Sequence, residues 1–96
     1  MGKFKLKLTM KKHELKTVNP YFDKVWEGLK TFDVRENDRD FKVGDTIILK
    51  EWDYKNELYT RREIRAEVTY ILSDFQEVIR PGYVVMSIFV ISFTHQ

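Results

Sequence analysis

The stretch GLKTFDVREND, residues 28–38, carries the strongest structural signal in the chain. Phe32 and Val34 alternate with polar residues, which is the pattern of a strand with one buried face. The pattern predicts that Phe32 and Val34 face the core and that Asp33 and Arg35 share the opposite face. The stretch also holds five charged side chains, an unusual density for a solvated strand, so it is the first candidate for a binding site.

A short helix is predicted immediately before this strand. Asn19 would cap its N-terminus and Pro20 would occupy the first helical position. Gly28 would end it after about two turns. Its apolar face, spaced at i, i+3, i+4 and i+7, would consist of Phe22, Val25, Trp26 and Leu29.

The rest of the chain reads as strands separated by turns. Strands are expected at residues 15–18, 30–36, 46–52, 58–72 (bent near 60–62) and 83–93. Residues 73–80 fit either a short helix or a loop. Short strands at this spacing favour a small barrel. We therefore expect a mainly β, α+β fold: a small mixed β-barrel of five to six strands, with one early α-helix and a short late helical turn.

Length and composition set the broad class. The chain has 96 residues, a 43% hydrophobic share and no cysteine. This predicts one packed domain over residues 1–96 and excludes disulfide and thiolate chemistry. Since no apolar run approaches the roughly 18 residues of a membrane span, we expect a cytoplasmic protein without a membrane partner. The expected oligomeric state is a monomer or weak dimer.

The net charge of +2 conceals an asymmetry between the N-terminus and the body. Residues 1–16 hold six lysines and one glutamate, whereas the remaining 80 residues hold 11 basic and 14 acidic side chains. Any nucleic-acid binding would therefore need a local patch or the basic arm. Lysines alternate with apolar residues in the arm, so residues 1–12 fit either a solvated edge strand or an arm that contacts phosphate.

The histidines and tryptophans of the chain are further candidates for a site. His13 and His95 lie at opposite ends of the chain without metal-ligand spacing, so both are expected to be solvated and no metal or cofactor is predicted. The P-loop, nucleophile-elbow and dinucleotide fingerprints do not occur in the sequence. Trp26 is expected in the core, and Trp52 either in the core or stacked on a base.

Basic residues also cluster in the second half of the chain. Arg61, Arg62 and Arg65 form either a solvated face or a contact to a nucleic-acid backbone. Tyr83, which follows a Pro-Gly turn, is a candidate to close one end of a binding cleft. In the first stretch, Asp33 could hold the planar fork of Arg35 for a phosphate or a base edge. Lys30 could supply a further positive charge.

The order of these motifs resembles the ASCH superfamily, a branch of the PUA-like β-barrels. The family signature Gly-x-Lys-x-x-Glu-x-Arg is matched by Gly28, Lys30, Asp33 and Arg35, with Asp in place of Glu. The segments DRDFKVGDTIIL and PGYVVMSI are similar to the family's following strands. The block from residue 13 onward also resembles small uncharacterised ASCH-type proteins of bacteria and their phages. The resemblance covers roughly residues 13–90.

The resemblance implies a barrel whose signature residues line a cleft for RNA or a nucleotide. Some ASCH relatives are amidohydrolases that deacetylate acetylated cytidine with a Lys, a Thr three residues later and a distant Glu. Lys30 matches that Lys, but Asp33 occupies the Thr position and Thr31 is out of register. Glu77 is the only candidate for the distant Glu. If the protein were an enzyme, Lys30 and Asp33 would be its catalytic residues.

Three functions therefore remain open at the level of sequence. The first is a module that binds RNA or a modified nucleotide through Lys30, Asp33 and Arg35, with Tyr83, Arg61 and Arg62 as further contacts. The second is an amidohydrolase acting on a modified nucleoside. The third is an accessory protein-interaction domain of a phage or its host, in which the charged strand is only solvated.

Overall fold

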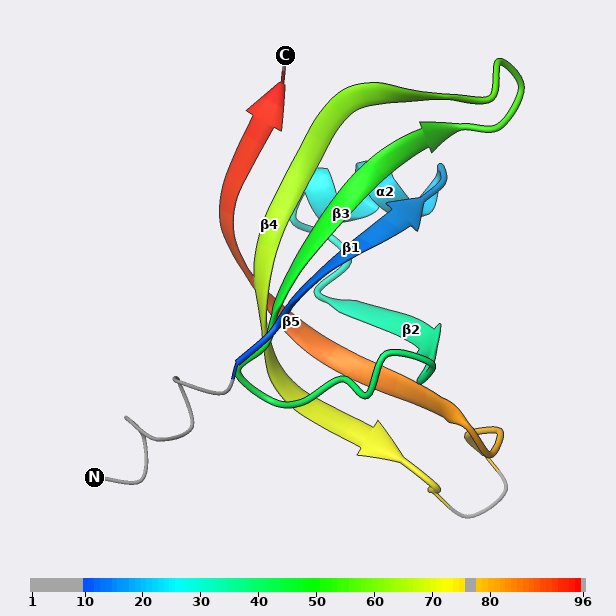
Figure 1. Cartoon of the computed structure of the whole chain (residues 1–96), viewed down its shortest axis with the longest axis vertical. Coiled ribbons are helices and arrows are strands. Elements are labelled where there is room, and N and C mark those ends of the chain that lie inside the picture. Colours follow the sequence, from blue (N-terminus) through cyan, green and yellow to red (C-terminus); the bar gives the residue numbers. More distant parts are fainter. Residues whose placement is uncertain (1–9, 76–77, 96) are drawn as a thin grey trace.

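The computed structural model describes residues 10–75 and 78–95. Its elements are β1 (Lys12–Thr17), α2 (Tyr21–Trp26), β2 (Phe32–Glu36), β3 (Thr46–Asp53), β4 (Leu58–Ser73) and β5 (Tyr83–His95). The strands form one sheet in the order β1-β3-β4-β5-β2 (Figure 1). β1 pairs with β3 in parallel, whereas the other three pairings are antiparallel. The prediction of a mainly β fold with one early helix is confirmed, with five strands in the sheet.

The two longest strands bend, and their curvature gives the sheet the shape of a half-barrel (Figure 1). The register between β4 and β5 shifts at Arg65/Ala66 and again at Val68/Tyr70. Such bulges increase local twist and bend the strand. Arg61 adopts a positive φ of 78° at the place where the bend near 60–62 was predicted. The bending folds the sheet over itself and brings its two edges, β1 and β2, toward one another.

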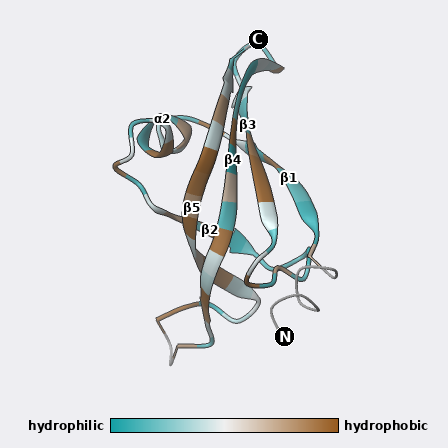
Figure 2. Ribbon diagram, turned by 90° about the vertical axis from the view of Figure 1, so that its left-hand side faces the viewer, coloured by the Kyte–Doolittle hydropathy of each residue, from teal (hydrophilic) through white to brown (hydrophobic). Residues whose placement is uncertain are grey.

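The core lies on the concave face of the sheet, beneath α2. Alternation is regular in β1, whose odd-numbered residues are buried and even-numbered residues exposed. Figure 2 shows hydrophobic residues concentrated along β3 and β5 and hydrophilic ones along β1. The core consists of Leu15, Phe22, Val25, Phe41, Ile47, Leu49, Ile64, Ala66, Val68, Val84, Met86 and Ile88.

The early helix differs from the prediction at both ends. It begins at Tyr21 with Pro20 as the N-cap residue, and Asn19 still accepts a hydrogen bond from the Asp23 amide at 2.8 Å. Trp26 packs against the core as predicted. The placement of Leu29 in the apolar face was wrong, because the helix ends before Gly28 turns the chain at φ +83° and leaves Leu29 72% exposed.

The last predicted element is described only in part. Residues 76–77 lie outside the described residues, as do residues 1–9 of the basic arm. On either side of residues 76–77, the Val78 amide donates to the Phe75 carbonyl at 3.0 Å. Within the described residues, no helix has the length and hydropathy needed to cross a membrane.

The prediction that His13 is solvated was wrong. Its side chain is 6% exposed and its Nε2 lies 2.8 Å from Oδ2 of Asp45, which is 1% exposed. The ring also packs edge-on against Phe41. Burial alone would raise the pKa of Asp45, but hydrogen bonds from His13 and from two backbone amides lower it below its ordinary value. The pair ties β1 to the turn before β3. His95, by contrast, is exposed at the end of β5.

A second buried carboxylate anchors α2 to the sheet. Glu51 accepts hydrogen bonds from Arg62 at 2.8 and 2.7 Å, from Asn19 at 2.6 Å and from the Thr60 hydroxyl. Arg62 also donates to Asp23 of α2 at 2.6 Å. The hydrogen bonds from Arg62 are the main reason that the pKa of Glu51 falls to about 2. Arg62 therefore has a structural role in this fold, because it links β4 to Glu51 of β3 and to Asp23 of α2.

The guanidinium of Arg62 also lies over two aromatic rings. It is 5.1 Å from the ring centre of Phe22 and 4.9 Å from that of Trp26. A cation over an aromatic face is attracted by the ring's quadrupole. These contacts complete the link between the helix and β4.

We expect Glu51→Gln to lower the free energy of unfolding near neutral pH. We also expect the free energy of unfolding of this variant to change less than that of the wild type as the pH falls. A carboxylate whose pKa is depressed from 4.5 to about 2 stabilises the fold above pH 4.5, and this contribution is lost as the pH falls toward 2. Its size is at most about 3 kcal/mol. Urea unfolding curves recorded at about pH 6, 5, 4 and 3 measure this contribution in the wild type and in Glu51→Gln.

Glu14→Gln is the matched control, because Glu14 is 56% exposed and pairs with Lys50 at 3.4 Å. It should change the unfolding midpoint little. Equal acid sensitivity of the wild type and Glu51→Gln would contradict the assigned role of Glu51.

Candidate functional site

The two faces of β2 are the reverse of the predicted ones. Asp33 is only 4% exposed, whereas Phe32 is 45% and Val34 52% exposed. The predicted sharing of one face by Asp33 and Arg35 is correct, but that face points inward. The cause is the register with β5, since Asp33 lies opposite Met86, which is fully buried. Directly opposed residues share a face of the sheet.

The buried carboxylate of Asp33 is held by two cations. Lys30 Nζ lies 3.2 Å from Oδ1, and Arg35 Nε lies 2.7 Å from Oδ2. Lys30 also donates to the Phe32 carbonyl at 2.6 Å. A carboxylate withdrawn from water costs free energy unless it is paired and hydrogen-bonded, and these contacts meet that requirement. The group of three carries a formal charge of +1.

Arg35 also joins the two edges of the sheet. From β2 it donates to the Lys16 carbonyl at 3.0 Å and to Thr17 Oγ1 at 2.9 Å, both on β1. Beyond β2, Arg39 donates to the Glu14 carbonyl at 2.8 Å. We call this junction, formed by Arg35 and Arg39 with the β1 carbonyls of Glu14 and Lys16, the seam. Side chains bridge the strands where a closed barrel would have a backbone ladder.

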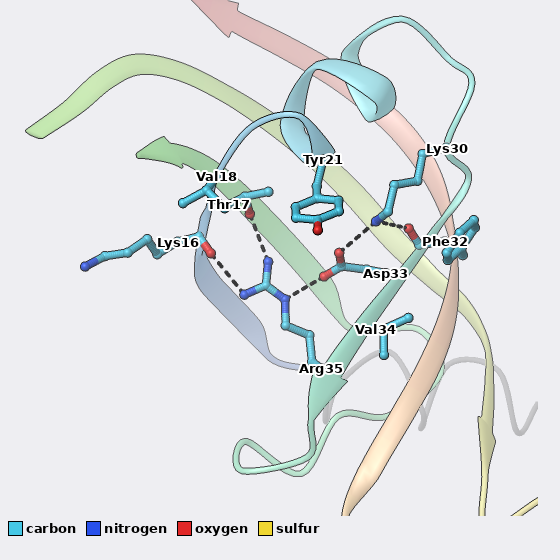
Figure 3. A pocket seen from close by; sticks show the side chains of 9 residues that line it. All are labelled: Lys16, Thr17, Val18, Tyr21, Lys30, Phe32, Asp33, Val34 and Arg35. Atoms are coloured by element: carbon cyan, nitrogen blue, oxygen red, sulfur yellow. Dashed lines mark hydrogen bonds and ion pairs between the residues drawn. The ribbon is translucent and has the colours of Figure 1, made fainter. Parts of the chain in front are cut away.

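A cleft of about 590 Å³ opens beside the seam. Its size falls within the range of small-molecule sites. Tyr21 points its ring from the start of α2 into the space above Asp33 and Arg35 (Figure 3). Figure 3 also shows the Lys16 side chain directed away from this group. The cleft is lined by Lys16, Thr17, Val18, Tyr21, Lys30, Phe32, Asp33, Val34 and Arg35.

The chemistry of the cleft suits an anion joined to a flat ring. Lys30 and Arg35 are orientated by Asp33, and their remaining donors can serve a phosphate. Tyr21, 55% exposed, offers an aromatic face within reach of the same group. Phe32 adds a second ring at the rim, where Lys30 Nζ lies 4.9 Å from its centre.

The other residues singled out in the sequence lie elsewhere. Tyr83 lines a separate hollow over the paired strands β2 and β5. Arg61 and Arg65 are exposed on β4. Trp52 packs edge-on against Tyr59 and lies under Lys16 Nζ, which is 4.0 Å from its ring centre. Glu77 and residues 1–9 of the arm lie outside the described residues.

Tyr21 and Thr17 are residues of the cleft that sequence reasoning missed. Tyr21 falls outside the apolar face of the helix, and such a large aromatic residue beside a helix start is a usable signal for a site. Thr17 carries no comparable signal. Its contact with Arg35 depends on the curvature of the whole sheet.

The family model for the Domain of unknown function (DUF3850) matches residues 12–88. The chain belongs to this family. The matched segment contains every residue that lines the cleft. The cleft is therefore built entirely within the DUF3850 domain.

The chain is also similar to an uncharacterised 12.9 kDa protein in the GpA 3′ region of Escherichia phage P2. The two are 42% identical over 67 residues, which is 68% of this chain and 60% of the phage protein. The chain thus spans about 60% of the length of that relative. The predicted likeness to small phage proteins is confirmed at this level.

We expect Arg35→Lys to destabilise the fold by about 1–3 kcal/mol, because a lysine cannot bridge Asp33, Lys16 and Thr17 with one planar group. The chain offers Arg65→Lys as a control, since Arg65 is exposed on β4. Urea unfolding compares the two variants with the wild type. Identical midpoints for Arg35→Lys and Arg65→Lys would show that the seam does not need the guanidinium.

Proposed function

We propose that this DUF3850 chain is an ASCH-type, PUA-like module that binds RNA or a modified nucleotide in the cleft. The observation that carries the proposal is the grouping of Lys30 and Arg35, both orientated by Asp33, beneath the ring of Tyr21. This arrangement offers charge for a phosphate and an aromatic face for a base at one place.

The assignment to the ASCH superfamily has support from the signature and from the sheet. Lys30, Asp33 and Arg35, three of the signature residues, all line the cleft. The fourth, Gly28, turns the chain between α2 and β2 at φ +83°. The mixed sheet curled into a half-barrel, with a helix after its first strand, is compatible with a PUA-like barrel.

The size and charge of the cleft favour a nucleotide over a long polyanion. The formal charge of the Lys30, Asp33 and Arg35 group is +1, and the cleft of about 590 Å³ has room for a base with its sugar and phosphate. A surface that binds duplexes would instead present a broad basic patch. The specificity of this site would come from the ring and the hydrogen-bond donors.

Hydrolysis of an acylated nucleoside is the second candidate, favoured by the position of Lys30 inside the cleft. Its side-chain nitrogen is engaged in hydrogen bonds to Asp33 and to the Phe32 carbonyl. The Thr17 hydroxyl donates to the Leu15 carbonyl at 3.2 Å and accepts from Arg35. We therefore rank binding above catalysis.

Binding is tested by calorimetric titration with nucleotides, acetylated cytidine and short single-stranded RNA. We expect Tyr21→Ala to weaken binding by about 5-fold or more, the loss of one stacked base, and Tyr21→Phe to retain most of the affinity. Tyr54→Ala is the control, because Tyr54 is 65% exposed in the turn after β3. Equal losses in Tyr21→Ala and Tyr54→Ala would contradict the proposed site.

The role of Lys30 is measured by salt dependence and by turnover. We expect Lys30→Gln to make binding of single-stranded RNA less sensitive to salt, by about 0.7 in the slope of log affinity against log salt, because one phosphate contact is lost. Lys42→Gln, in an exposed ion pair with Asp40 at 3.2 Å, serves as the control. If the wild type deacetylates acetylated cytidine and Lys30→Gln does not, hydrolysis becomes the better-supported function.

A further inference from the structure

A second hollow lies beside the cleft, over the paired strands β2 and β5 and next to residues 78–80. Its volume is about 270 Å³, and Val34 lines both the hollow and the cleft. The Asn37 amide donates to the Gly82 carbonyl at 2.7 Å, which holds the turn before β5 against the end of β2. The hollow is lined by Val34, Val78, Ile79, Arg80, Tyr83 and Val85.

We infer that the ligand is a single strand of at least two nucleotides and that this hollow receives the base next to the one in the cleft. The inference rests on the proposed function, which it narrows from nucleotides in general to oligonucleotides. Its basis is that the cleft and the hollow adjoin each other at β2, and that both contain an aromatic ring and a cation.

The chemistry of the hollow fits a base and not a phosphate. Val34, Val78 and Val85 form apolar walls, and Val78 is 76% exposed. The Arg80 guanidinium lies over the Tyr83 ring, 5.6 Å from its centre. A base can stack on an aromatic ring or on the plane of an arginine, and since every base has a π-face, such a pair accepts any base.

The position of the hollow fits a strand that leaves the cleft across β2. Phe32 and Val34 are two residues apart on the outer face of β2, where both line the cleft and Val34 also lines the hollow. Their exposure follows from the register with β5 and leaves both side chains available to a ligand. They form the apolar ridge over which the sugar of the second nucleotide would pass.

The test uses ligands of increasing length on the full chain. The four 5′-nucleoside monophosphates are titrated first, and the base that binds most tightly defines homo-oligoribonucleotides of about two, three and six residues. We expect affinity to rise by about 5- to 150-fold from the monophosphate to the oligomers, as one further stacked base provides. Tyr83→Ala should abolish this gain and leave the monophosphate affinity unchanged.

Tyr83→Phe keeps the ring and should keep the gain, and thermal unfolding establishes that both variants fold. Monophosphate binding without a gain on lengthening overturns this inference alone. A gain that survives Tyr83→Ala overturns the assignment of the hollow, and binding there of an apolar peptide would identify a protein ligand. If the wild type binds none of these probes, both this inference and the proposed function fail.

Discussion

The ion pair between Asp33 and Arg35 is the constraint on which the site depends. The carboxylate faces the interior at 4% exposure, so it needs the guanidinium at 2.7 Å and the lysine at 3.2 Å to offset its lost hydration. The same guanidinium then reaches the backbone of β1 at Lys16. One residue thereby neutralises a buried charge, joins the edges of the half-barrel and forms the floor of the cleft. Replacing it would disturb the stability of the fold and the shape of the site together.

The seam and the Glu51 network both pair a buried carboxylate with an arginine, but they differ in what surrounds the arginine. In both, a buried carboxylate binds an arginine that links separate elements: Arg35 joins β2 to β1, and Arg62 joins β4 to α2. The Arg62 guanidinium is covered by Phe22 and Trp26, whereas Arg35 borders open space beneath Tyr21. The aromatic cover makes the first arginine structural. The side chain of Arg35 is as exposed as that of Arg62, at 23% against 24%, but it lines the cleft, where a ligand can reach it.

Sequence reasoning predicted the strands and the grouping of Lys30, Asp33 and Arg35 because these follow from local periodicity and spacing. It inverted the faces of β2, since period-two alternation says which residues share a face but not which face is inside. That choice is made by β5, whose buried Met86 lies opposite Asp33. The burial of His13 was missed for a related reason, because its partner Asp45 lies 32 residues away. Tyr21 and Thr17 join the cleft only through the curvature of the sheet.

The seam also bears on the alternative that the chain binds a protein. A gap between two sheet edges could admit an extended peptide as an additional strand, which would pair with the exposed backbone of β1. Here the Glu14 and Lys16 carbonyls of that edge already accept hydrogen bonds from Arg39 and Arg35. An inserted strand would have to displace both arginines from these carbonyls, and Arg35 is the residue that also pairs with the buried carboxylate of Asp33. Since removing hydrogen bonds from a charged group costs free energy, the seam favours a ligand that binds beside these arginines over a peptide that replaces them.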